Sequence, residues 1–138
     1  MTLVDYSDME QEIKDAPEPK TLPRGVEVKA RIIAIRDGVS DTNNAQYYQP
    51  VFDIPDDPMI IEFNDFFWDL REKATIDPKQ YQRNLNKFKN FAASFDVDIS
   101  KPFDWEDLIG HEGWIITGFK KDDEYGDKNT VAKYVVKR

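Results

Sequence analysis

The sequence predicts a mainly β domain with one long helix. Alternating apolar and polar residues over residues 26–36 are typical of a half-buried strand. Apolar residues spaced by three and four along residues 77–95 indicate an amphipathic helix. Two β-type runs, residues 114–119 and 130–136, flank a polar, turn-rich segment and predict a closing hairpin. With two further strands before the helix, this order predicts a five-stranded OB-fold barrel, with the helix between strands three and four.

The barrel is expected over residues 24–138, after an acidic flexible arm at residues 1–23. Prolines interrupt regular structure in the arm, and its carboxylates repel one another. In the first strand, the apolar pattern changes phase at Ile32 and Ile33. This change predicts a β-bulge in a long, bent strand, which suits a small closed barrel.

Residues 46–54 and 59–70 are expected to form the second and third strands, joined by a turn at residues 55–58. Pro50 cannot donate a backbone hydrogen bond, so we expect an edge or a bulge at that point of the second strand. The third strand is rich in aromatic and β-branched side chains, which favour a pleated, half-buried surface.

The helix is expected to begin with Asp77 as the N-cap and Pro78 at the first helical position. Basic side chains lie on the other faces of this helix. Its predicted apolar stripe consists of Tyr81, Leu85, Phe88, Ala92 and Phe95.

Composition favours one domain in a reducing compartment. The chain has 138 residues and no cysteine, so thiolate catalysis, disulfides and cysteine-based zinc sites are excluded. The first residues are acidic and lack the apolar run of a secretory signal. We therefore expect a soluble protein of the cytoplasm, or of the host cytoplasm if a bacteriophage encodes it, with no membrane partner.

The net charge of −8 argues against a generic nucleic-acid binder, because phosphate contacts need cations. The charges are nevertheless unevenly distributed. The arm and residues 53–70 and 96–112 are acidic, whereas the first strand, the helix and the hairpin are mildly basic. The folded chain could present one cationic groove on an acidic protein. The competing interpretation is that charges simply alternate over a soluble surface.

Several segments resemble those of small bacteriophage-type single-stranded-DNA-binding proteins with an OB fold. They are Gly25-Val-Glu-Val-Lys-Ala-Arg-Ile-Ile-Ala, Ile60-Ile-Glu-Phe-Asn-Asp-Phe-Phe, the helix, and Leu108-Ile-Gly-His-Glu-Gly-Trp-Ile-Ile-Thr-Gly-Phe with Asn129-Thr-Val. The resemblance covers about residues 24–138. It implies a protein without enzymatic activity or cofactor that coats single strands, without sequence preference, in DNA replication or recombination.

Many members of that family recruit partner proteins through an acidic C-terminal tail. This chain ends instead in Lys137 and Arg138. Three explanations remain open: the acidic N-terminal arm substitutes for the tail, the sequence is truncated, or recruitment differs. Replication or recombination proteins bound through the arm are therefore expected partners, besides single-stranded DNA or RNA, and a homo-oligomer is a further alternative.

Binding a single strand needs cations for phosphates and flat rings for bases. In an OB barrel, the second and third strands and two flanking loops usually form the binding face. The candidate cations are Lys29, Arg31, Arg36, Arg71, Lys73, Lys120, Lys121 and Lys133. The candidate rings are Tyr47, Tyr48, Phe52, Trp68 and Tyr125.

Each ring also has a structural interpretation. A ring in a strand, such as that of Phe52, belongs to the core more often than to a binding face. Tyr47 and Tyr48 are adjacent and must face opposite sides, so we expect one of them to be exposed. Trp105 and Trp114 are interpreted as packing residues. Tyr125 lies in a turn and is expected to be exposed.

One observation opposes the nucleic-acid interpretation, because residues 53–69 lie on the expected binding face and contain carboxylates but no cation. Two explanations stay open: either these carboxylates lie in the turn and on the far face, or the bound strand runs along the first and closing strands instead. Two other functions also stay open. The first is a protein-binding module. The second is a metal-dependent nuclease using Glu27, Lys29 and Asp56, although these residues occur in the wrong order for the nuclease motif. No metal-ligand spacing is present, and the single histidine, His111, is expected to be incidental.

Overall fold

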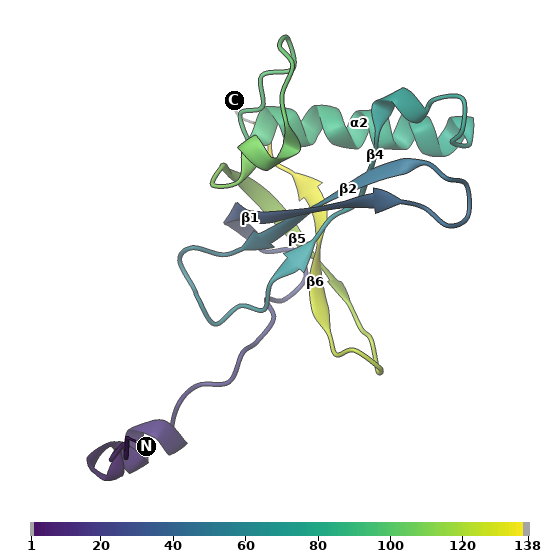
Figure 1. Cartoon of the computed structure of the whole chain (residues 1–138). Coiled ribbons are helices and arrows are strands. Elements are labelled where there is room, and N and C mark those ends of the chain that lie inside the picture. Colours follow the sequence, from purple (N-terminus) through teal and green to yellow (C-terminus); the bar gives the residue numbers. More distant parts are fainter. Residues whose placement is uncertain (1, 137–138) are drawn as a thin grey trace.

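The computed structural model describes residues 2–136 and shows one antiparallel sheet with two α-helices (Figure 1). Within these residues no helix has both the length and the apolar character needed to cross a membrane. Lys137 and Arg138, the basic residues that stand where the resembled family has an acidic tail, lie outside the described residues. The strands are β1 (Glu27–Val39), β2 (Gln46–Asp53), β3 (Phe63–Asn64), β4 (Phe67–Trp68), β5 (Glu112–Lys120) and β6 (Lys128–Tyr134), and the α-helices are α1 (Glu10–Lys14) and α2 (Pro78–Ser94).

The sheet has the strand order β3-β2-β1-β5-β6, and β4 also pairs with β2. Over the described part of the chain, no backbone ladder joins β3 to β6, so this six-stranded sheet is not closed. A mainly β fold is therefore confirmed. The predicted count of five strands is wrong, because the expected third strand, residues 59–70, forms two short strands.

Strand β1 bends at the predicted position. Its register against β2 shifts between Ile32 and Ala34, so Ile33 is the extra residue of a β-bulge. The first half of β1 pairs with β5, and the second half pairs with β2, with Arg31 opposite a residue of each. The bulge thus bends β1 so that it can pair with β5 along its first half and with β2 along its second half.

Pro50 explains why the third strand is interrupted. The prediction of an edge position is wrong, because β2 lies between β1 and the pair β3 and β4. Asp65 donates its backbone N–H to the carbonyl of Pro50 at 3.2 Å. A regular antiparallel pair would exchange a second bond, but Pro50 has no N–H to donate. The ladder therefore stops between β3 and β4, at Asp65 and Phe66.

The aromatic core lies between the sheet and α2. Phe52, Phe63 and Phe67 from the strands are almost fully buried, as are Phe91 and Phe95 from the helix. The ring centroids of Phe67 and Phe91 lie 5.0 Å apart, and those of Phe52 and Phe95 lie 5.5 Å apart. These contacts fix the helix against the inner face of the sheet.

Helix α2 begins as predicted, with the Asp77 carboxylate accepting from the backbone N–H groups of Lys79 and Gln80. The predicted apolar stripe is wrong at Leu85, which is 38% exposed, whereas Asn84 is only 5% exposed. Asn84 is buried because its carboxamide pairs with the backbone of Trp68. It accepts from the Trp68 N–H at 2.9 Å and donates to the Trp68 carbonyl at 3.0 Å. The Asn84 side chain therefore supplies the two backbone hydrogen bonds that a neighbouring strand would give to Trp68 of β4.

The end of the expected arm lies against the sheet. Lys20 forms a parallel bridge with Ile60, and the Leu22 backbone exchanges hydrogen bonds of 2.8 Å with the Asn129 side chain. Before Lys20 the chain is exposed, and α1 lies away from the sheet at the end of an extended segment (Figure 1). That the whole of residues 1–23 is flexible stays a prediction.

We predict that Asn84→Ala lowers the free energy of unfolding by about 2 kcal/mol, because it leaves both backbone groups of Trp68 without their partner. Asn86→Ala is the matched control, since Asn86 is exposed on the same helix. Urea denaturation followed by circular dichroism measures both. Equal losses in the two variants would show that the paired hydrogen bonds do not support β4.

Candidate functional site

An aromatic cluster of Tyr47, Phe66 and Trp68 lies on the side of the sheet that faces away from the core, here called the outer face. Tyr47 is directly opposite Trp68 in the ladder of β2 and β4, so their side chains point to the same side. Neighbouring residues alternate between faces, and Phe67 is fully buried in the core. Phe66 and Trp68 on either side of it therefore point outward.

The three rings contact one another. The Tyr47 and Phe66 rings stack with centroids 5.0 Å apart and an angle of 27° between planes. The Trp68 ring meets Phe66 edge-on at 4.7 Å. A Cβ at position 38 would lie 2.6 Å from the Tyr47 hydroxyl oxygen, so Gly38 allows this ring to lie close over β1. All three rings are only half-buried, and part of each stays accessible to a flat ligand.

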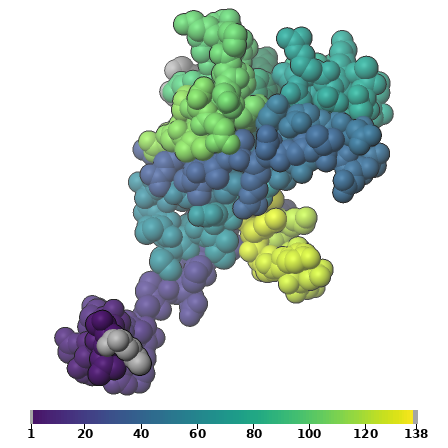
Figure 2. Space-filling view, in the orientation of Figure 1, coloured from purple at the N-terminus to yellow at the C-terminus, as the bar shows by residue number. Residues whose placement is uncertain are grey.

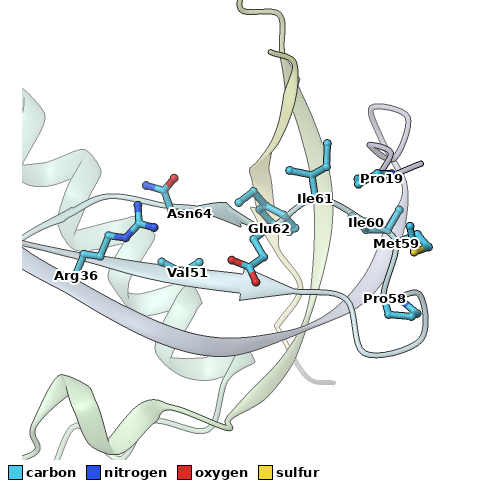
Figure 3. A pocket seen from close by; sticks show the side chains of 10 residues that line it. Pro19, Arg36, Val51, Pro58, Met59, Ile60, Ile61, Glu62 and Asn64 are labelled. Carbon is cyan, nitrogen blue, oxygen red and sulfur yellow. The ribbon is translucent and has the colours of Figure 1, made fainter. Parts of the chain in front are cut away.

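A groove of about 550 Å³ lies farther along the same strands, and none of the three cluster rings lines it. Arg36, Val51 and Asn64 line one part of it, and residues 58–62 line the other (Figure 3). The Arg36 side chain is exposed and has no carboxylate partner among residues 2–136. The groove therefore contains a cation that is available to an anionic ligand, with Glu62 as its acidic lining residue.

Most of the carboxylates that opposed a nucleic-acid ligand are bound within the protein. Asp53 accepts from Arg31 at 3.1 and 2.5 Å, and Asp57 lies 3.3 Å from the Lys20 ammonium. Asp69 accepts from the Tyr48 hydroxyl at 3.0 Å. Much of the negative charge of this segment is therefore compensated locally or used in hydrogen bonds.

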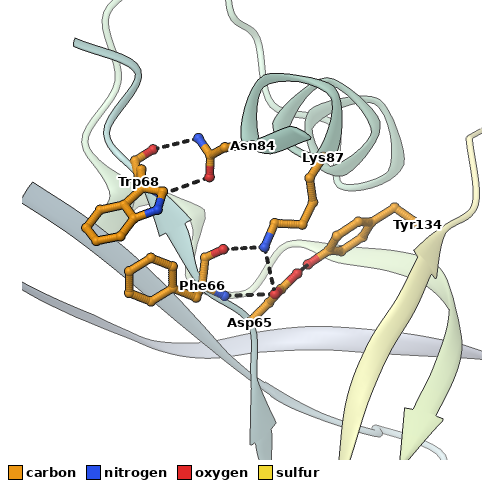
Figure 4. A network of polar contacts seen from close by, with 6 residues as sticks. All are labelled: Asp65, Phe66, Trp68, Asn84, Lys87 and Tyr134. Atoms are coloured by element: carbon orange, nitrogen blue, oxygen red, sulfur yellow. Dashed lines mark hydrogen bonds and ion pairs between the residues drawn. The ribbon is translucent and has the colours of Figure 1, made fainter. Parts of the chain in front are cut away.

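Asp65 holds the backbone that carries the aromatic cluster (Figure 4). Its carboxylate accepts from the Tyr134 hydroxyl at 2.6 Å, from the Lys87 ammonium at 3.1 Å and from the Phe66 N–H at 2.8 Å. Lys87 also donates to the Phe66 carbonyl. Figure 4 shows the rings of Phe66 and Trp68 on the opposite side from this network. The network thus fixes Phe66 from β6 and α2 while its ring stays on the outer face.

Two tyrosines have raised pKa values in this region. Burial is the main cause for Tyr134, and the charge of Asp65 and the hydrogen bond to it raise the Tyr134 pKa further, well above its ordinary value of 10. Burial followed by the Asp69 hydrogen bond raises the pKa of Tyr48 to about 12. Both hydroxyls therefore stay protonated as donors over the physiological pH range.

The predicted pair Tyr47 and Tyr48 is divided between the two faces. Tyr48 points to the inner side and stacks on Trp105, with ring centroids 4.9 Å apart. It lines a second cleft, together with Arg71, which follows β4. Lys73 lies near this cleft, 5.8 Å from the centroid of the Tyr81 ring. Trp68 of the aromatic cluster also lines this cleft, whereas Tyr47 and Phe66 do not.

The prediction that Phe52 stacks on a base is wrong. Its side chain has no exposed surface, because β2 turns it into the aromatic core. Trp105 packs against core rings as expected. Trp114 was interpreted as a packing residue, and this is also wrong, because it is 47% exposed on β5.

The remaining candidate cations lie on other parts of the sheet. Lys29 is 3.9 Å from Glu112, and Arg31 is bound to Asp53. Lys133 lies opposite Ile116 on β6. The cluster of the outer face therefore includes none of these three.

The hairpin between β5 and β6 carries the last candidates. Lys120 and Lys121 are exposed, and Tyr125 is 84% exposed. Figure 2 shows the yellow hairpin and the blue β1–β2 end projecting on the same side of the molecule, with a recess between them. The hairpin thus projects beside the β1–β2 end of the sheet (Figure 2).

Phe66 and Arg83 were missed from the sequence as site residues. The alternation of residues 64, 66 and 68 with the buried Phe63 and Phe67 is the signal that could have found Phe66. Arg83 was interpreted as part of a solvated helix face, but it lines a cleft beside Phe66 and Trp68. A helix residue gives no sign in the sequence of which strand it will face.

No family model matches this chain, and no curated protein matches it.

Over residues 2–136, no three or more His, Asp or Glu side chains are grouped so that they could hold a metal ion. Glu27 begins β1, and Asp56 lies in the turn after β2. The nuclease interpretation gains no support from this arrangement and stays a hypothesis.

We predict that the free energy of unfolding decreases above about pH 10 less steeply in Tyr134→Phe than in the wild type. The unfolded chain releases the Tyr134 proton near pH 10, whereas the folded chain retains it, so rising pH favours unfolding by up to about 1.4 kcal/mol per pH unit. Well below pH 10, Tyr134 is protonated in both the folded and the unfolded chain, so it does not make the free energy of unfolding depend on pH. Urea denaturation between pH 8.5 and 11 measures the slope.

The control for this prediction is Tyr125→Phe. Tyr125 is exposed in the hairpin, so its removal should keep the wild-type slope. The raised pKa of Tyr48 also makes the free energy of unfolding decrease at high pH. Because Tyr48 is present in the wild type and in both variants, it does not affect the comparison. If Tyr134→Phe and Tyr125→Phe showed the same pH dependence, the hydrogen bond between Tyr134 and Asp65 would not have the assigned role.

Proposed function

We propose that this chain is a single-stranded-DNA-binding protein without enzymatic activity, built on an OB-type topology. If β3 and β4 are counted as one interrupted strand, the order of the sheet is third, second, first, fourth and fifth, with α2 between the third and fourth. OB barrels are partly open, and they bind oligonucleotides on the face of strands two and three. The side-chain bond between Tyr134 and Asp65 spans the unpaired edges in this arrangement.

The cluster of Tyr47, Phe66 and Trp68 on the outer face is the observation that carries this proposal. Its half-buried rings lie on the second and third strands, where an OB-type ligand would bind. Stacking on such rings contributes about 1–3 kcal/mol per base and tolerates every base. We therefore propose binding without sequence preference.

Phosphate contacts complete the proposal. Arg36 is exposed beside the cluster, and Lys120 and Lys121 lie at the base of the flanking hairpin. Contacts of this kind release counterions, so the affinity should decrease with salt concentration. The role in replication or recombination, in the cytoplasm of a bacteriophage host, is taken from the family resemblance and is part of the proposal.

We predict that the wild type binds fluorescein-labelled oligo-dT at low salt and that Phe66→Leu weakens this binding about tenfold. Leucine keeps apolar bulk but removes the flat surface, whose stacking contributes about 1–3 kcal/mol. Phe103→Leu is the matched control, because Phe103 is partly exposed in the second cleft. Fluorescence anisotropy at several salt concentrations measures the affinity, with oligo-rU as a competitor to compare RNA.

Absence of wild-type binding at low salt would contradict the proposal. An equal loss in Phe66→Leu and Phe103→Leu would show that the outer face is not the interface. Circular dichroism of both variants ensures that the comparison is made between folded proteins.

Recruitment of a protein partner is a second candidate function, favoured by the exposed side chains of the arm. Leu3 is 90% exposed, Tyr6 60% and Ile13 53%, among carboxylates that no cation of the sheet contacts. Largely exposed apolar side chains in an acidic segment are suited to a partner with an apolar, basic groove. Replication or recombination proteins remain the proposed partners, and a second copy of this chain is an alternative.

For this second function we predict capture of a purified replication or recombination protein that persists after nuclease treatment. The triple variant Leu3→Ser, Tyr6→Ser and Ile13→Ser should lose this capture, since it removes the apolar contacts and keeps the charge. Its affinity for oligo-dT should stay within about twofold of wild type, because the three substituted residues lie in the part of the arm that extends away from the sheet (Figure 1). Capture that is equal with both proteins would contradict a role of the arm.

A further inference from the structure

Helix α2 carries a concentration of positive charge that the fold itself does not explain. Its residues include Lys79, Arg83, Lys87 and Lys89 and no aspartate or glutamate, in a chain with a net charge of −8. Lys79, Arg83 and Lys87 recur every four residues, so they share one flank of the helix. Lys89 lies on a different flank from Arg83 and Lys87, about 120° and about 160° away from them around the helix axis.

Two cations of this flank, Arg83 and Lys87, face the aromatic cluster. A cleft of about 360 Å³ separates α2 from β4, and its lining consists of Phe66, Trp68, Gln80, Arg83, Asn84 and Lys87. The cleft therefore combines ring surface from the sheet with amide and cationic groups from the helix.

Two of the polar lining residues already have partners, and two do not. Asn84 is bound to the Trp68 backbone, and Lys87 is bound to Asp65 and the Phe66 carbonyl. Gln80 and Arg83 are exposed and have no side-chain hydrogen bond or ion pair within residues 2–136. Their donors are therefore available to a ligand in the cleft.

We propose that this cleft is a nucleotide subsite, so that a bound single strand continues from the outer face onto α2. This inference rests on the proposed function and extends it. A base would lie against the exposed parts of Phe66 and Trp68, and the Arg83 guanidinium would bind the adjoining phosphate through its paired N–H donors. The Gln80 carboxamide would bond to the sugar or the base edge. The helix is then part of the interface and not only a support for the sheet.

The test compares Arg83→Glu with Lys89→Glu, which makes the same charge change on the flank that does not face the cleft. Binding of labelled oligo-dT is measured by anisotropy from 50 to 300 mM salt. Arg83→Glu should weaken binding at least tenfold more than Lys89→Glu. It should also reduce the slope of log K against log salt by about 0.7 relative to that control, the value for one phosphate contact with a single strand. Gln80→Ala should weaken binding a few-fold without changing the slope.

The outcomes separate the two proposals. If the wild type does not bind oligo-dT, the proposed function fails and this inference fails with it. If the wild type binds and Phe66→Leu weakens binding, but Arg83→Glu equals Lys89→Glu, only the subsite is overturned. If Arg83→Glu does not fold, Arg83→Gln repeats the test, because it removes the charge without reversing it. An Arg83→Gln affinity for oligo-dT equal to that of the wild type would overturn the subsite.

Discussion

The Asp65 carboxylate is the group on which the arrangement of β4, β6 and α2 depends. It is only 15% exposed, and it binds Tyr134, Lys87 and the Phe66 N–H together. No backbone ladder joins β3 to β6 in the described residues, so these side-chain bonds replace the strand pairing that would close the sheet. A carboxylate in this position is stable because an ammonium and two further donors compensate its desolvation.

Side chains also compensate for the strand interruption that Pro50 causes. Its missing N–H interrupts the third strand, and an interrupted strand would leave backbone groups unpaired. Asn84 and Lys87 supply hydrogen bonds to Trp68 and Phe66 from one helix, so α2 takes the place of a neighbouring strand. These bonds hold the backbone of the outer-face rings, and Trp68 also packs against a small core cluster of Ala45, Ile76 and Tyr81. Rings held in this way are accessible to a ligand without loss of order.

The sequence predicted those features whose cause is local. The bulge at Ile33 follows from a change of apolar phase, the cap of α2 from Asp77 and Pro78, and the hairpin from its turn residues. Burial of Asn84 instead of Leu85 could not be predicted, because it depends on a hydrogen bond to a strand distant in sequence. The outward position of Phe66 could be predicted only if side chains were known to keep alternating between faces through the interruption between β3 and β4. Alternation showed that Tyr47 and Tyr48 face opposite sides, but it could not show which of the two lies on the outer face.

The distribution of charge in the folded chain resolves the objection that an acidic protein should repel phosphate. Repulsion depends on the carboxylates near the ligand and not on the net charge, since exposed charges beyond about 10 Å are largely screened. Asp53, Asp57, Asp65 and Asp69 have partners within the protein, whereas Arg36 and Arg83 have none in residues 2–136. The arm carries further negative charge away from the sheet (Figure 1). Within residues 2–136 the outer face is therefore flanked by two unpaired cations, with Glu62 as an acidic neighbour of Arg36, although the whole molecule is acidic. Under the proposed function, these cations would offset the repulsion that the net charge predicts.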